Sequence, residues 1–193
     1  NVISRGWTQP NGRPHAEVVA LKKNKKLFKG ATLYSTLEPC SHFGKTSPCV
    51  DLIIKAKIRR VVIATLDPNP KVNGKGIKKL KQNNIKVTLG ILEKKAKKIN
   101  LGFFQKITKN IPSISTKIAI SKNGKISDPN KRWITSEHSR LYGHFLRAKY
   151  DAALTGINTV LKDNPLLTCR LSGMEKYSPI RIILDSDLKI REN

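Results

Sequence analysis

Short apolar runs alternate with helix-like segments along this chain, and this alternation restricts its fold more than any other feature. Residues 60–66 form a continuous, largely β-branched apolar run, as in a strand buried on both faces of a parallel sheet. Over 92–109 apolar residues recur every three to four positions, which predicts an amphipathic helix. Alternating strands and helices indicate a layered α/β fold. In this part of the chain we predict strands at 31–36, 60–66 and 85–89, and helices at 15–27, 48–56, 76–83 and 92–109.

A domain boundary is predicted where residues 110–112 (Asn-Ile-Pro) end the last of these helices. The first domain would span 1–110 and the second 111–193. In the second we predict a helix at 137–149 and strands at 114–121, 151–156 and 180–185. Because the chain starts in a strand remnant without Met and ends on a half-built sheet, we expect the natural protein to extend beyond both ends.

The charge of the chain raises the question of nucleic-acid binding. There are 38 Lys and Arg residues against 13 Asp and Glu, a net charge of +25. Lys is nevertheless spread along most of the length, and it accompanies many Ile and Asn residues, which A/T-rich codons also encode. The sequence contains no Arg-rich arm and no basic strand studded with base-stacking aromatic residues. We therefore attribute most of the charge to compositional bias and expect no nucleic-acid partner.

The compartment is inferred from missing targeting segments and from the cysteine count. No apolar stretch is long enough to span a membrane, and none follows a basic N-terminus as in a signal peptide. Three cysteines, an odd number, point to a reducing compartment in which the thiols can bind metal. We expect a cytoplasmic protein without a membrane partner, and leave open whether it forms a homo-oligomer.

The strongest chemical signal combines one imidazole with two thiols. His15 lies at the start of a predicted helix, Cys40 in a loop after a strand, and Cys49 at the start of the next helix. One nitrogen and two sulfur donors suit Zn²⁺, and three ligands leave the fourth tetrahedral position to water, as in catalytic sites. Cys169 is the candidate for a fourth, structural ligand, but it lies beyond the predicted boundary.

Glu17 lies two residues after His15 and would place a carboxylate beside the metal. It can take a proton from the water that zinc activates and deliver it to a leaving amine. His-x-Glu followed later by Pro-Cys is the signature of zinc nucleobase deaminases. That signature usually closes with two residues between the thiols, whereas eight separate Cys40 from Cys49.

The longer spacer is the pattern of one family. The segments 14–17, 36–49, 67–70 and 74–76 together resemble the bifunctional deaminase–reductases of riboflavin biosynthesis, and the likeness extends over nearly the whole chain. This resemblance implies a cytidine-deaminase-like layered sheet domain, followed by the first part of a dihydrofolate-reductase-like α/β domain.

For the first domain, the resemblance implies hydrolytic deamination of a phosphoribosyl pyrimidine, 2,5-diamino-6-(5-phosphoribosylamino)pyrimidin-4-one. The site would comprise the zinc ligands His15, Cys40 and Cys49, with Glu17 as the catalytic proton shuttle. Two residues of the spacer correspond to substrate contacts, namely His42 and Lys45. A cationic loop beside the metal suits the phosphate of such a substrate.

For the second domain, the resemblance implies NADPH-dependent reduction of the ribosyl group by the full-length protein. Residues that correspond to cofactor contacts are Ala119, Trp133, Thr159, Asp163 and Ser186. Residues that correspond to substrate contacts are Arg147, Leu167 and Arg170. Asn123 and Lys131 depart from the family pattern, and no Gly-rich dinucleotide fingerprint is present. We expect these 193 residues alone not to support reduction.

Two alternatives stay open at this point. The chain could be another zinc deaminase, acting on a nucleoside, a nucleotide or tRNA, although the long spacer and the second domain argue against it. It could also be a zinc-stabilised basic module that binds nucleic acid, which predicts four protein ligands and no turnover.

Overall fold

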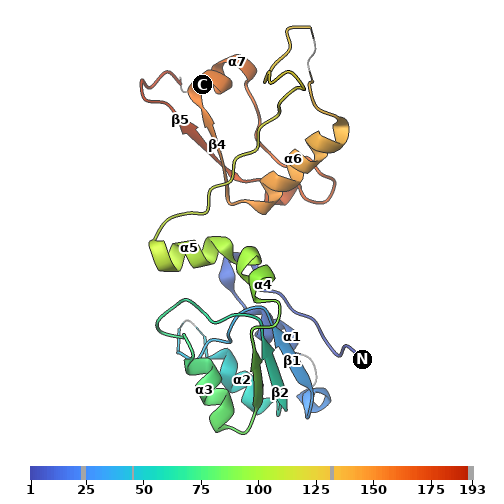
Figure 1. Cartoon of the computed structure of the whole chain (residues 1–193), viewed down its shortest axis with the longest axis vertical. Helices are drawn as coiled ribbons and strands as arrows, with labels where there is room; N and C mark the ends of the chain where they lie inside the picture. The colour runs from blue at the N-terminus through green and yellow to red at the C-terminus, as the bar shows by residue number, and fades with distance from the viewer. Residues whose placement is uncertain (23–24, 45, 131–132, 191–193) are drawn as a thin grey trace. The chain divides into compact units, whose positions relative to one another are not determined.

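The computed structural model describes residues 1–22, 25–44, 46–130 and 133–190. The chain divides into two compact units, of which the first is Asn1–Ile114 and the second begins at Ser115 (Figure 1). Each unit has a parallel sheet with helices, so the predicted α/β class is confirmed.

The first unit is built on a three-stranded parallel sheet in the order β1-β2-β3. Its strands are β1 (Thr32–Ser35), β2 (Arg60–Ile63) and β3 (Lys86–Leu89). Ser35 pairs with Ile63, and Ile63 pairs with Leu89, so the carboxyl ends of all three strands lie at one edge. Loops that come after parallel strands therefore leave from the same edge of the sheet, and this edge carries the candidate site.

The helices of the first unit follow the predicted order with two differences in extent. The predicted helix 15–27 is wrong in length, because the α-helix ends at Ala20 and a 3₁₀ turn begins at Lys25, while residues 23–24 lie outside the described residues. Leu21 and Phe28 both belong to the apolar core. The predicted helix 92–109 is interrupted at Asn100, whose side-chain amide donates to the carbonyl of Ala96 at 2.9 Å and competes with the helical backbone. The helices are α1 (Ala16–Ala20), α2 (Cys49–Lys55), α3 (Lys75–Gln82), α4 (Glu93–Ile99) and α5 (Leu101–Lys109), with 3₁₀ turns at Pro10–Gly12 and Lys25–Phe28.

A single apolar core holds this unit together. Alternate residues of β2, Val61 and Ile63, face it, while Val62 on the opposite face is only 5% exposed. The strand is thus buried on both faces, as its continuous apolar run predicted. The cluster comprises Leu21, Phe28, Val50, Ile53, Ala56, Ile58, Val61, Ile63, Leu80 and Ile85.

The second unit contains a two-stranded parallel sheet of β4 (Ala152–Gly156) and β5 (Ile180–Leu184). Helix α6 (Glu137–Lys149) has the predicted bounds, and Ser136 caps it by accepting the backbone N–H of Ser139 at 3.3 Å. Helix α7 (Ile157–Asp163) and a 3₁₀ turn at Glu175–Tyr177 were not predicted.

The predicted strand at 114–121 is wrong. Over that range the described residues form no ladder, and the only sheet described in this unit is β4-β5. A β-prone sequence becomes a strand only where a neighbouring strand accepts and donates its backbone hydrogen bonds.

In the described part of the chain, no helix combines the length and apolarity needed to cross a lipid bilayer.

The core makes one stability prediction. Ile53 on α2 is fully buried, whereas Ile99 on α4 is 75% exposed. We expect Ile53→Ala to lower the free energy of unfolding by about 2–5 kcal/mol, because it removes buried apolar atoms and leaves a cavity. Ile99→Ala is the matched control and should change it by less than about 0.5 kcal/mol. Urea unfolding measures the free energy of unfolding of both variants, and equal decreases in the two would contradict the assigned core.

Candidate metal centre and second-unit residues

Three donor atoms from separate segments converge beside the carboxyl end of the first sheet. His15 immediately precedes α1, Cys40 lies in the loop after β1, and Cys49 is the first residue of α2. Nδ1 of His15 lies 3.3 Å from Sγ of Cys49 and 3.5 Å from Sγ of Cys40. All three donor atoms lie within 4.8 Å of one another. The three residues that the sequence pattern selected are thus brought together, and Nδ1 is the imidazole atom that faces both sulfurs.

The spacing of these donors fits a zinc ion. With Zn–S bonds of about 2.3 Å and Zn–N bonds of about 2.0–2.1 Å, tetrahedral geometry places a sulfur and a nitrogen ligand about 3.5 Å apart. The two sulfur–nitrogen distances, 3.3 and 3.5 Å, are close to that value. Cys169, the candidate fourth ligand, lies in the second unit and does not belong to this group of donors.

The pKa values of the two thiols are shifted in opposite directions, so Cys49 holds its proton more tightly than Cys40 does. The pKa of Cys40 is lowered to about 5, because the side chain and the backbone N–H of Cys49 both donate to its sulfur and His15 lies beside it. The same pairing, together with burial, raises the pKa of Cys49. A divalent cation that binds both sulfurs as thiolates must displace this remaining proton.

Glu17 lies in the first turn of α1, two residues from His15. Its side chain is half-buried, and Oε1 lies 3.5 Å from the hydroxyl of Ser35 at the end of β1. Burial raises the pKa of Glu17, and the negative charge of Cys40 acts in the same direction, against a lowering hydrogen bond from the backbone. A carboxyl group held in this way can accept and return a proton near the metal centre.

The other two residues predicted for this domain lie in the spacer between the thiols. His42 is half-buried, and its Nδ1 is buried without a hydrogen-bond partner in the described structure. Lys45 lies outside the described residues, so the structure does not place it.

In the second unit, the predicted substrate residues gather around a histidine that the sequence analysis did not select. Nδ1 of His144 accepts the backbone N–H of Arg170 at 3.2 Å and lies 3.3 Å from Nη1 of Arg147. Arg147 also donates to the carbonyl of Thr168 at 3.4 Å, and half-buried Leu167 precedes that residue with a φ of 52°. The spacing His144–Arg147 on one helix face was the only signal for this histidine.

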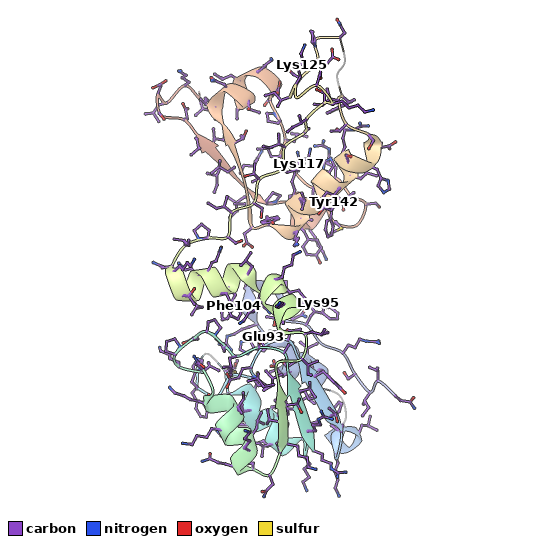
Figure 2. The ribbon with its side chains drawn as sticks, viewed as in Figure 1. Glu93, Lys95, Phe104, Lys117, Lys125 and Tyr142 are labelled. Atoms are coloured by element: carbon purple, nitrogen blue, oxygen red, sulfur yellow. The ribbon has the colours of Figure 1, made fainter. Side chains whose placement is uncertain are left out.

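Ala119 lines a cavity of about 440 Å³ between the 117–120 segment and α6. The side chains of Lys117 and Tyr142, which also line it, are labelled in Figure 2. Trp133 is exposed and lies 5.0 Å beneath the guanidinium of Arg140.

The remaining predicted cofactor residues lie in the segments that follow β4 and β5. Gly156 at the end of β4 pairs with Leu184 at the end of β5, so the segments after these two strands leave from the same edge. Thr159 and Asp163 lie four residues apart on α7, directly after β4, and Ser186 comes after β5. Ligands of open parallel α/β sheets characteristically bind outside this edge.

Comparison with known proteins matches a different family model to each end of the chain. The family model of the cytidine and deoxycytidylate deaminase zinc-binding region matches residues 1–65, and that of the RibD C-terminal domain matches residues 112–193. The riboflavin biosynthesis protein RibD of Aquifex aeolicus is 48% identical over 191 residues, which cover 98% of this chain and 53% of the relative. This chain belongs to the RibD family.

Other RibD proteins show the same degree of similarity. That of Escherichia coli is 39% identical over 98% of the chain. A crystal structure of a diaminohydroxyphosphoribosylaminopyrimidine deaminase/5-amino-6-(5-phosphoribosylamino)uracil reductase from Thermotoga maritima has a TM-score of 0.86 and 44% identity, and covers 95% of this chain and 53% of that one. RibD of Acinetobacter baumannii has a TM-score of 0.85 and 37% identity. The chain spans about half the length of the RibD relatives it matches.

Membership of the RibD family confirms the predicted fold class of both units and the family resemblance. It also agrees with zinc as the metal, since the model that matches the first unit describes a zinc-binding region. The roles assigned to individual residues stay predictions, although the structure brings the three metal-binding candidates together.

Zinc stoichiometry separates a three-ligand centre from a four-ligand one. We expect Cys49→Ser to reduce bound zinc from about one ion per chain to a small fraction, because a hydroxyl replaces a thiolate donor. Cys169→Ser is the matched control and should retain wild-type zinc. Metal analysis of the purified variants measures this, and loss of zinc from Cys169→Ser would show that the second unit supplies a ligand.

His144 makes a pH-dependent contribution to the folding stability of the second unit. Its pKa is lowered, because partial burial disfavours the imidazolium and Arg147 and Arg170 repel it. The folded state therefore binds this proton less readily than the unfolded state, so the contribution is present above about pH 6.5 and is lost as the pH falls through the lowered value.

We expect the urea midpoint of the second unit to fall between pH 7.5 and 5.0, and to fall less in His144→Asn. Asn keeps an acceptor for the backbone N–H of Arg170 but does not titrate. Trp133 fluorescence reports on this unit in a Trp7→Phe background, because the chain has two tryptophans and Trp7 belongs to the first unit. Identical pH dependence in both proteins would contradict the assignment.

Proposed function

We propose that the first unit catalyses the zinc-dependent hydrolytic deamination of 2,5-diamino-6-(5-phosphoribosylamino)pyrimidin-4-one, an early step of riboflavin biosynthesis. The observation that carries the proposal is the convergence of His15, Cys40 and Cys49 with Glu17 two residues from the imidazole. The Thermotoga relative is a deaminase and reductase of this substrate class, which supports the choice of substrate.

The chemistry divides between the metal and the chain. When bound, Zn²⁺ supplies the Lewis acidity that generates hydroxide from water at neutral pH. His15, Cys40 and Cys49 would hold the ion by one nitrogen and two sulfur donors, which leaves one tetrahedral position for water. Deamination breaks the bond between a ring carbon and its exocyclic amino group, forms a C–O bond in its place and releases ammonia.

Glu17 would move the proton in this reaction. Its carboxylate takes the proton of the attacking water and delivers it to the departing amine, so one group serves both halves of the exchange. Burial raises the pKa of Glu17 above its ordinary value, which is the direction that favours proton exchange near neutral pH.

Recognition of the phosphoribosyl group is assigned to the spacer loop. His42 has a buried ring nitrogen without a protein partner, and Lys45 adds a cation to the same loop. A phosphate offers acceptor oxygens to both side chains.

The reducing environment that thiolate ligands require supports a cytoplasmic location.

For the second domain, taken as residues 111–193, we propose the first part of an NADPH-dependent reductase. The cofactor would be contacted by Thr159, Asp163 and Ser186 of the segments after β4 and β5, together with Ala119 and Trp133. Arg147 and Arg170 would bind the substrate phosphate or ribose, with Leu167 packed beside them. The reduction belongs to a longer protein, since the chain covers about half of its relatives.

Glu17→Gln tests the deaminase proposal. We expect ammonia release from the diaminopyrimidine substrate to fall by about 10²- to 10⁴-fold, because an amide cannot carry the proton. Bound zinc should be retained, since Glu17 is not among the donors. The matched control is Glu93→Gln on α4, which removes an exposed carboxylate paired with Lys97 at 2.6 Å and should leave the rate unchanged. Full activity in Glu17→Gln would exclude it as the shuttle, and wild-type protein without ammonia release would exclude the substrate.

A further inference from the structure

We propose that Glu38 is the positioning residue of the metal centre. It lies two residues before Cys40, and its carboxylate fixes the Cys40 loop (residues 36–48) to the amino end of α3. The proposal rests on the zinc site assigned above. It concerns what holds one ligand in place rather than which residues bind the metal.

The carboxylate of Glu38 accepts backbone N–H groups from two other segments. Oε2 accepts the N–H of Gly74 at 2.9 Å and that of Asp67 at 3.4 Å, and Oε1 accepts the N–H of Ile77 at 3.2 Å. Gly74 caps α3 and Ile77 lies in its first turn, where N–H groups have no partner within the helix and the dipole favours an anion. Glu38 is only 2% exposed, so water cannot replace these contacts.

The Cys40 loop packs closely against α3 at Gly76. A Cβ added at Gly76, in the first turn of α3, would collide with the carbonyl oxygen of Pro39 and lie 3.0 Å from Oε1 of Glu38. Pro39 itself is fully buried. The loop therefore contacts the helix through backbone and carboxylate together, immediately before it reaches Cys40.

Cys40 itself is fixed to a different helix. The carbonyl of Cys40 accepts the N–H of Val50 at 3.2 Å, and its sulfur accepts the N–H of Cys49 at 3.2 Å, both on α2. Cys40 is thus held between α2 and α3, and Glu38 supplies the α3 side. Metal–ligand distances are held within about 0.2 Å, so a shift of the loop would weaken binding without removing a ligand.

Glu38→Gln tests this role by metal affinity. Gln has nearly the same shape, but it accepts through one oxygen only and turns an NH₂ group towards backbone donors. We expect the Kd for Zn²⁺, measured by competition with a chromogenic chelator, to rise about 10- to 100-fold. The thiolate–metal absorption of the Co²⁺-loaded protein should weaken or shift. Circular dichroism of the metal-free variant establishes that it is folded in the assay.

Two further variants make the result specific. Lys79→Gln breaks an ion pair of 2.6 Å between α3 and Asp51 of α2 without touching the loop, and should leave zinc affinity unchanged. Gly76→Ala presses on the same contact from the helix side, and should weaken zinc binding even if Glu38→Gln does not fold.

The outcomes separate this inference from the proposed function. If wild-type protein binds no zinc, the proposed function fails. If it binds zinc, and folded Glu38→Gln or Gly76→Ala binds it with unchanged Kd and an unchanged Co²⁺ spectrum, only the positioning role is overturned. Lower stability with unaltered metal binding would mean that Glu38 supports the fold alone.

Discussion

The convergence of one imidazole nitrogen and two sulfurs is the arrangement on which the proposed chemistry of the first unit depends. The donors come from residues 15, 40 and 49, and no two of them belong to the same helix or strand. The parallel sheet makes this meeting possible, because the chain leaves β1 at the edge where β2 and β3 also end. Cys40 then lies in the loop after β1, and Cys49 opens the helix that returns the chain to the sheet.

Much of this arrangement could be predicted because it is encoded locally. The apolar run of β2 and the bounds of α6 depend on patterns within a few residues, and both were confirmed. The metal-binding candidates could be selected because His15, Cys40 and Cys49 are chemically distinctive and lie next to elements of known type. A motif of this kind needs no knowledge of the tertiary contacts that bring its members together.

The features that could not be predicted depend on partners far along the chain. Glu38 was read only as part of a motif, since the groups that it contacts lie 29 to 39 residues away and are backbone amides without a sequence signature. The segment 114–121 has strand-like composition but no ladder partner in the described structure. The break at Asn100 has a local cause instead, because its side-chain amide competes for the carbonyl of Ala96, and apolar periodicity does not report such a contact.

The charge distribution links composition to the site. Although cations outnumber acidic residues 38 to 13, the charged residues buried in the described structure are both acidic, Glu38 and Asp67. Asp67 has a raised pKa, mainly through burial, and the charges of Glu38 and Cys40 act in the same direction. The negative charges of Glu38, Asp67 and Cys40 therefore repel one another. The surface lysines are solvated and screened, so they offset little of this repulsion. A divalent cation held at Cys40 would attract the neighbouring carboxylates and so offset part of this repulsion.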